Sequence, residues 1–505
     1  MVIIQSHEIT EDQILETDIV IIGSGAGGSV AAAKFSPHHR IIMLEEGPYV
    51  TKDSFTQDES YAYRKYYRRQ GALATDDQSI TILQGKVYGG STTINWMTSL
   101  RTPEHVLNEW VADYGLNNYS PKHMQPYFEK VEQRLNVHRI AEYEHNPHNR
   151  IILDGTQELG IHGESSFNNS KNCIGCGQCS IGCAYDAKQD MRLTYLKDAL
   201  KSDSFTVYTG TKAEIIQYQT KNKQIITAYT QQTPSRILTI ETKRTIVAGG
   251  AVMSPLLLQK SGLRKNKTLG KFFRIHPVTI AIGIYDTIID AGYGIPQSAV
   301  SFEYANLDGN GYGFWLEVPP SPPLSSGFLL PGFGNRRREL LQKYRHLGVI
   351  IVLVRDGANK KSSGEIRWRR GRPSIRYKIS FQDKQHLLKG MENACEVHFA
   401  AGAKHVYSGH TNLPEVLDKA DIGGLRKLPN GPNQLTMFSA HPMGTARMGT
   451  NPQLSVIGED MQMHDYSGIY IMDGSALPTA PGVNPMITIL SCVSNACKIS
   501  DQLEL

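Results

Sequence analysis

A glycine-rich stretch near the start of the chain has the residue types and spacing needed to hold a phosphate. Gly23, Gly25 and Gly28 fit the pattern G-x-G-x-x-G, directly after the apolar run 17–22. The first glycine permits a tight turn, the second lets a pyrophosphate approach the backbone, and the third lets a helix pack closely against a strand. Backbone N–H groups at the start of that helix then face the phosphates. The residues expected to contact a dinucleotide here are Gly23, Ser24, Gly25, Ala26, Gly27 and Gly28.

An acidic side chain follows at the distance that a dinucleotide site requires. Glu45 ends the apolar run 41–44, 22 residues after Gly23. An acid at this place accepts hydrogen bonds from the ribose hydroxyls and repels a 2′-phosphate, which disfavours NADP. Its neighbour Glu46 is expected to be solvated. The pattern alone leaves FAD and NAD as alternatives.

The C-terminal part of the chain carries groups suited to oxidising an alcohol. His441 lies in the stretch 439–449, and Asn484 lies in 482–485. Oxidation removes a proton from the hydroxyl as a hydride leaves the carbon, and an imidazole with a pKa of about 6.5 is a suitable base, worth roughly 10²–10⁴ in rate. An amide can donate to the developing alkoxide. A histidine before proline is more often a core residue, and His276 is expected to be one.

Four of the seven cysteines fall close together, at Cys173, Cys176, Cys179 and Cys183. The spacing C-x2-C-x2-C-x3-C is that of a bacterial ferredoxin, with Ala184 in place of the usual proline. Such a cluster passes electrons singly to an external acceptor. A structural zinc site is an alternative, although zinc ligands usually come as two separated pairs. Free thiols or a disulfide are the third interpretation. We favour the iron–sulfur cluster.

The elements that must position these residues alternate between strands and helices. The apolar runs 17–22 and 41–44, with a small-residue helix at 29–35 between them, predict parallel strands with a right-handed crossover. Alternating residues over 205–248 predict three antiparallel strands, and 254–260 predicts a helix.

Further elements follow from the same reasoning. A polar helical region is expected over 104–134, and strands over 347–355 and 364–380. The run 349–354 reads as a buried strand. The proline-rich segment 318–334 is expected to be an ordered, irregular loop, because proline is excluded from helix interiors and central strands.

Composition excludes several classes of protein. The chain has 505 residues, 40% of them apolar and 20% charged, as in a soluble globular protein. Its net charge of +5 is too small to imply a nucleic-acid partner, and the basic stretch 367–372 is expected to be a solvated hairpin. No apolar run reaches the 18 residues of a membrane span, and the N-terminus lacks signal-peptide features. We expect a cytoplasmic protein with no transmembrane segment, with a peripheral membrane location as the alternative.

Longer motifs resemble one enzyme family. The stretch 85–95 resembles the first signature of the glucose–methanol–choline (GMC) flavoprotein oxidoreductases, and 250–262 the second, with Arg264 where that signature usually ends in glycine. Residues 473–475 and 482–485 match the family's closing region. The segment 179–196, like the stretch from the proline-rich loop to Asp356, resembles the long-chain fatty alcohol oxidase branch.

The resemblance implies FAD as the cofactor, with His441 as the base and Asn484 as the hydrogen-bonding partner of the substrate oxygen. Flavin and pyrophosphate contacts are implied for the first signature, and ribityl-phosphate contact for Asp473. The strand 207–213 is implied to meet the adenine. The further cofactor contacts implied are Gly89, Gly90, Ser91, Asn95, Ala213, Asp473, Gly474, Asn484, Pro485 and Met486.

The expected fold class is α/β, with a Rossmann-like FAD-binding domain of discontinuous segments and a second α+β substrate domain built on an antiparallel sheet. The expected FAD-binding segments are 15–100, 200–276 and 436–505, and the substrate domain takes 101–199 and 277–435. The expected reaction is oxidation of a primary alcohol, long-chain or apolar, to the aldehyde, with oxygen, a quinone or a cytochrome as electron acceptor. The alternative is a catalytically idle flavoprotein or an electron relay through the cysteines.

Overall fold

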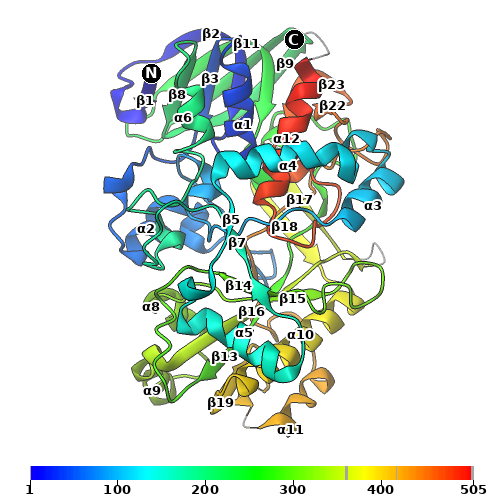
Figure 1. Cartoon of the computed structure of the whole chain (residues 1–505). Helices are drawn as coiled ribbons and strands as arrows, with labels where there is room; N and C mark the ends of the chain where they lie inside the picture. Colours follow the sequence, from blue (N-terminus) through cyan, green and yellow to red (C-terminus); the bar gives the residue numbers. More distant parts are fainter. Residues whose placement is uncertain (1, 359–361, 414, 417, 502–505) are drawn as a thin grey trace.

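The protein is built on two large sheets, one above the other in Figure 1, with helices packed on both. The computed structural model describes residues 2–358, 362–413, 415–416 and 418–501. Both the α/β class and the pairing of a parallel-centred sheet with an antiparallel one agree with the expected fold. Among the described residues, no helix combines the length and apolar character needed to cross a bilayer.

The first sheet has the strand order β1-β8-β3-β2-β11-β10-β9. All neighbours from β1 to β11 are parallel, while β10 and β9 continue antiparallel. The expectation of antiparallel strands over 205–248 is therefore only partly right. β8 pairs in parallel with β1 and β3, and β11 pairs in parallel with β2 as well as antiparallel with β10. Its strands are β1 (Val2–Gln5), β2 (Gln13–Ile22), β3 (Ile41–Glu45), β8 (Phe205–Thr209), β9 (Thr211–Thr220), β10 (Lys223–Thr230), β11 (Ile237–Val247), and beside β11 β23 (Tyr466–Ile471) with β22 (Gln462–Met463).

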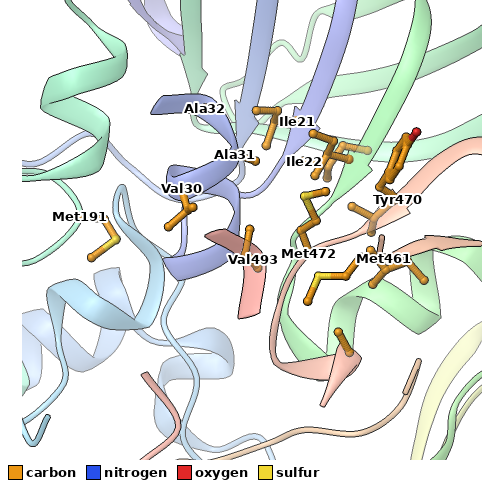
Figure 2. Packing of buried hydrophobic residues seen from close by; sticks show 14 of the residues in the cluster. Ile21, Ile22, Val30, Ala31, Ala32, Met191, Met461, Tyr470, Met472 and Val493 are labelled. Atoms are coloured by element: carbon orange, nitrogen blue, oxygen red, sulfur yellow. The ribbon is translucent and has the colours of Figure 1, made fainter. Parts of the chain in front are cut away.

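The helix α1 (Ala26–Phe35) joins β2 to β3 and confirms the predicted crossover unit. It begins at residue 26 rather than 29, directly after the glycine turn. Its small residues let it pack tightly: Ala31 and Ala32 are fully buried beside the first sheet, and Val493 of α12 (Met486–Asp501) lies in the same cluster (Figure 2). The C-terminal helix therefore completes the core around the N-terminal glycine loop.

The second sheet has the order β20-β19-β13-β16-β15-β14-β6. Its central strand β16 is buried along its whole length, which confirms the buried strand predicted there. One face packs against α10 and α5, and the other faces the cleft between the sheets. The elements are β6 (Glu164–Ser165), β13 (Val278–Ile284), β14 (Ala299–Ser301), β15 (Phe314–Glu317), β16 (Leu347–Val354), β19 (His405–Ser408), β20 (Glu415–Val416), α5 (Pro147–Leu159) and α10 (Phe381–Ala400).

Two predicted segments differ in the structure. The helical region is two helices, α3 (Glu104–Tyr114) and α4 (Pro121–Leu135), because Gly115 adopts a left-handed φ of 71° that ends the first. The proline-rich segment contains a short helix, α8 (Pro323–Leu329), which begins on a proline, where the missing N–H costs nothing. The basic hairpin is confirmed as β17 (Ser363–Arg369) paired with β18 (Arg372–Lys378).

The remaining elements are β4 (Thr81–Ile82), β5 (His138–Arg139), β7 (Phe167–Asn168), β12 (Lys271–Phe273), β21 (Phe438–Ser439), α2 (Glu59–Tyr66), α6 (Tyr195–Ala199), α7 (Gly250–Lys260), α9 (Asn335–Gln342) and α11 (Lys419–Ile422). The division into two domains at the expected boundaries stays a proposal. Two observations refine it: β1 joins the first sheet, and α4 packs against α12.

Candidate active site

One cleft runs between the two sheets and collects residues from both ends of the chain. It encloses about 1900 Å³ of space, its open mouth included. Every residue predicted to contact the dinucleotide or the alcohol lines this cleft, except Gly28 and Gly89. The residues expected to contact a dinucleotide and those expected to contact the alcohol therefore share one cleft.

The glycine turn has the geometry that a phosphate requires. Gly23 has a φ of 107°, and a Cβ on Gly28 would lie 2.1 Å from the Gly23 carbonyl oxygen, so the third glycine serves helix packing as predicted. A Cβ on Gly25 would instead meet nothing closer than the Gly90 Cα, at 3.9 Å. The open space beside Gly25 is on the cleft, where a pyrophosphate can approach the backbone.

Glu45 holds the glycine turn in place. Its Oε2 accepts hydrogen bonds from Ser24 N at 3.0 Å and Ser24 Oγ at 2.6 Å, and its Oε1 accepts from Gly47 N at 2.7 Å. Burial raises the pKa of this carboxyl. Gly89 N donates to the same Ser24 hydroxyl, at 2.9 Å. Gly89 therefore supports the glycine turn without lining the cleft. The expectation that Glu46 is solvated is wrong, because Glu46 lines the cleft and pairs with Arg68 at 2.8 Å.

The middle of the cleft is held by Asp473 at the end of β23. Its Oδ2 accepts from Gly250 N at 2.8 Å and from Ser254 Oγ, both in α7, and its Oδ1 accepts from Ser475 N at 2.8 Å. Burial raises the pKa of this carboxyl too. The contacts place Asp473 and Gly474 at the N-terminus of α7, on the cleft wall.

The first signature meets the C-terminal closing region farther along the cleft. Asn95 Nδ2 lies 3.1 Å from Met486 Sδ, and Pro485 lines the cleft beside them. Ser91 Oγ accepts from Gly85 N at 3.0 Å, which closes the first signature into a compact turn. Ala213 lies on β9 and lines the cleft together with Glu45.

His441 has a partner that the sequence did not indicate. Its Nδ1 lies 3.2 Å from Nδ1 of His276, and the rings meet edge to face. Gly482 N–H donates to His276 Nε2 at 3.2 Å, so the ring proton of a neutral His276 lies on Nδ1. Burial lowers the pKa of His441 to about 4 and that of His276 well below its usual value. His276 was expected to be structural, yet it contacts the proposed base. The signal was the His-Pro dipeptide, which occurs at both places.

Asn484 lines the cleft and faces a second residue that sequence reasoning missed. Its Nδ2 donates to Oε2 of Glu317 at 3.4 Å, while its own Oδ1 is buried without a hydrogen-bond partner. Glu317 is fully buried on β15, and burial raises its pKa to about 7. The signal was a single acid in the apolar run 314–318.

The wall of the cleft around His441 and Asn484 is mostly apolar. It comes from β13, β16 and β21 of the second sheet and from the segment that follows the first signature. The apolar residues are Trp96, Met97, Val278, Ile351, Leu353 and Phe438. An alcohol bound with its hydroxyl at His441 therefore has its carbon chain against an apolar surface.

The cysteine cluster is not assembled as a metal site. In the described part of the chain, no group of three or more His, Cys, Asp or Glu side chains is placed to hold a metal ion, and none of the cysteines forms a disulfide. Burial raises the pKa of Cys173, Cys176 and Cys179, whereas metal binding requires thiolates. Cys179 and Cys173 pack instead with Met97 in a small apolar cluster. The predicted iron–sulfur cluster is therefore not supported.

Comparison with known proteins decides the family. Two models described as "GMC oxidoreductase" match residues 18–278 and 360–492. The chain belongs to the GMC oxidoreductase family. Among its relatives is long-chain-alcohol oxidase FAO4B of Arabidopsis thaliana, 30% identical over 97% of this chain and 68% of that protein. Long-chain-alcohol oxidase FAO3 of the same plant is 29% identical over 95% of this chain and 67% of its own length.

Solved structures share the fold of this GMC oxidoreductase. Pyridoxine 4-oxidase from Mesorbium loti superposes with a TM-score of 0.71 at 16% identity, covering 96% of this chain and 99% of that one. Formate oxidase gives a TM-score of 0.72 at 14% identity, covering 98% and 99%. The protein is therefore an oxidoreductase with the GMC fold.

FAD is the cofactor that this family implies, and the cleft fits it. The open space beside Gly25 suits a pyrophosphate, and the buried carboxyl of Glu45 stands where ribose hydroxyls are recognised. The cleft continues from there, past Asp473, to His441 and Asn484. The individual contacts predicted from the sequence remain proposals.

Proposed function

We propose that this GMC oxidoreductase converts a primary alcohol with an apolar carbon chain into the aldehyde. The supporting observation is that His441 and Asn484, 43 positions apart in the sequence, line one apolar-walled cleft that also contains the glycine turn. FAD, when bound, accepts the hydride that leaves the carbinol carbon. The residues of the chain bind the hydroxyl and remove its proton.

His441 is the proposed base. The low pKa of His441 keeps the ring neutral at physiological pH, so it has a lone pair available for the hydroxyl proton. His276 donates from Nδ1 to His441 Nδ1, which puts the His441 proton on Nε2. Removal of the hydroxyl proton by His441 Nε2 requires the opposite tautomer of both rings. His441 then donates from Nδ1 to His276 Nδ1, the His276 proton lies on Nε2, and the Gly482 N–H contact is given up. The contact between the two rings thus controls the state of the base.

Asn484 is the proposed partner of the substrate oxygen. Its Nδ2 carries two protons, of which one is directed at Glu317, so the second is available to a developing alkoxide. Its unpartnered Oδ1 is available to accept from the hydroxyl in the ground state. Together His441 and Asn484 hold the oxygen and leave the carbinol hydrogen to face the bound flavin.

An apolar, long-chain alcohol is the proposed substrate, and dioxygen is the proposed electron acceptor in preference to a quinone or a cytochrome. The apolar cleft wall supports the substrate class, because burying methylene groups against it favours long chains by about 0.8 kcal/mol for each group. The Arabidopsis relatives are named as long-chain-alcohol oxidases, which supports both proposals.

Anaerobic titration of the purified holoprotein tests this function. A series of primary alcohols of increasing chain length is added, and bleaching of the yellow flavin absorbance is followed. We expect bleaching by primary alcohols, faster for longer chains, and rapid recovery of the colour on admission of air. A flavin that no alcohol bleaches would contradict the proposed activity, and recovery only with a quinone or cytochrome would contradict the proposed acceptor.

A further inference from the structure

Glu317 occupies a position where an acid is unexpected. It ends β15, a strand whose other residues are apolar, and it is fully buried. Side chains alternate along a strand, so Phe314 and Leu316 pack on the side of α10 whereas Trp315 packs on the opposite side, toward the cleft. Glu317 follows Trp315 by two positions and lies on the same, cleft-facing side.

Three N–H groups converge on this carboxylate. Gln297 Nε2 and Asn484 Nδ2 both donate to Oε2, and Trp315 Nε1 donates to Oε1 at 3.0 Å. The amide of Gln297 is itself oriented, because its Oε1 accepts from the Thr98 hydroxyl. An ionised carboxylate accepts hydrogen bonds only, so these donors match the ionised form.

Gln297 and Asn484 come from separate parts of the fold, and both line the cleft. Gln297 precedes β14 in the second sheet, whereas Asn484 precedes α12, which packs against the first sheet. A single oxygen of Glu317 therefore joins the two halves of the cleft wall behind the proposed substrate position. It also decides which amide atoms of Asn484 remain free, namely one N–H and the unpartnered Oδ1.

We infer that ionised Glu317 is a positioning residue, which fixes the amide orientation of Asn484 and thereby the atoms that Asn484 offers to the substrate hydroxyl. This inference rests on the proposed alcohol oxidation. A protonated Glu317 would need to donate a hydrogen bond, and the acceptor available on Asn484 is its Oδ1. Protonation would therefore favour the flipped amide, in which Oδ1 is turned away from the substrate.

Burial places this change within the physiological pH range, because it raises the pKa of Glu317 to about 7. The cross-strand neighbours of Glu317, Val300 and Ile351, are apolar. Three histidines are the titratable groups on the adjoining elements. His276 packs against Trp315 and contacts His441, and His145 contacts Ser298. Burial lowers the pKa of all three histidines. These histidines are therefore neutral where Glu317 titrates, and activity is expected to rise with pH through about 7.

The test compares holoenzyme carrying Glu317→Gln with the native protein. The glutamine variant keeps the shape but cannot ionise. We expect kcat/KM above pH 8 to fall about 10- to 100-fold, with kcat more affected than KM, and the rise through pH 7 to disappear. The matched control is Glu392→Gln, which removes another buried glutamate, one on α10 paired with Arg426 and outside the cleft wall. This control should keep the rise.

Persistence of the rise through pH 7 in Glu317→Gln would overturn the inference. Failure of the proposed function is recognised separately, because then no alcohol bleaches even the native flavin. In that case the inference is tested by crystal structures of the native protein and of Glu317→Gln, each soaked with 2-methyl-2-dodecanol. This tertiary alcohol has no carbinol hydrogen and cannot be oxidised. An Asn484 amide that is flipped or displaced in the variant supports the inference, and an unchanged one contradicts it.

Discussion

His276 and His441 share a hydrogen bond between their Nδ1 atoms, 3.2 Å apart. Each histidine precedes a proline, and the two dipeptides are 165 positions apart in the sequence. His276 is held in turn by Gly482 N–H on Nε2 and by Asp356, which accepts from its backbone N–H. The proposed base is thus oriented by a residue that is fixed on two sides.

Loss of His276 should slow catalysis without emptying the flavin site. In His276→Ala the ring of His441 loses its orienting partner, and misplacement of a reacting group can cost up to about 100-fold in rate. His276→Asn keeps an amide near the place of Nδ1, whose oxygen can accept from His441 Nδ1, and should restore part of kcat. Stopped-flow reduction of the flavin by alcohol measures both. Equal rates in the alanine and asparagine variants would argue against an orienting role.

Removal of the proposed base should cost more. His441→Ala is expected to slow anaerobic flavin reduction by about 10²–10⁴-fold, because the hydroxyl proton then has no positioned acceptor. His148→Gln serves as the control, since His148 is buried on α5 and contacts Val349 outside the cleft. If His441→Ala reduces its flavin at the native rate, His441 is not the base.

Two glycines of the phosphate turn should respond differently to alanine. Gly25→Ala meets no atom closer than 3.9 Å, so the apoprotein should keep its stability, yet the new methyl group stands on the cleft and should lower the FAD content. In Gly23→Ala the methyl group would lie 2.4 Å from the Ala248 carbonyl oxygen, at a φ of 107°, so the fold itself should suffer. The ratio of flavin to protein absorbance measures the FAD content of each variant, and urea unfolding measures its stability. Full FAD occupancy in Gly25→Ala would contradict the predicted pyrophosphate position.

The buried carboxyl of Glu317 should also appear in the pH dependence of stability. Its pKa is raised from 4.5 to about 7 by folding, so between these values the native state binds more protons than the unfolded state. The free energy of unfolding of the native sequence should therefore fall, relative to that of Glu317→Gln, by about 3 kcal/mol as pH rises from 4.5 to 7. Urea titrations of both apoproteins at pH 5 and pH 8 measure the difference. A difference that does not change with pH would show that Glu317 has an ordinary pKa.

The apolar wall should set the preference for chain length. Phe438→Ala removes an apolar contact from the cleft, and such a loss is worth about 10- to 200-fold in kcat/KM. Long alcohols should lose more than short ones. Phe381→Ala is the matched control, because Phe381 is 75% exposed. An equal loss of kcat/KM for ethanol and dodecanol would show that the carbon chain does not lie against Phe438.

Much of the fold around the glycine turn could be predicted because it depends on local patterns. The glycine turn, α1 and Glu45 lie within one crossover unit, whose periodicity and turn residues are visible in a short stretch. Errors arose where pairing depends on distant strands. Nothing near residues 237–247 shows that β11 will lie beside β2 rather than only beside β10.

The second layer of the active site was missed for a related reason. Glu317, Gln297 and His276 act through side chains that reach across the fold, and their sequence neighbourhoods resemble ordinary strands and loops. The cysteine spacing had the opposite effect, because it predicted an iron–sulfur site that the structure does not support. A short motif with a known metal-binding pattern does not show whether burial will keep the thiols protonated.

The sharing of one cleft by both ends of the chain has a consequence for biosynthesis. The helices α1 and α12 lie in the same half of the molecule, yet residues 36–485 separate them in the sequence. At about 5–20 residues per second, a ribosome needs roughly 20–90 s to travel between their codons. During that interval α12 has not yet been synthesised, so the face of α1 that packs against α12 is uncovered. Until α12 has been synthesised, the nascent chain therefore lacks part of the wall that closes around the flavin.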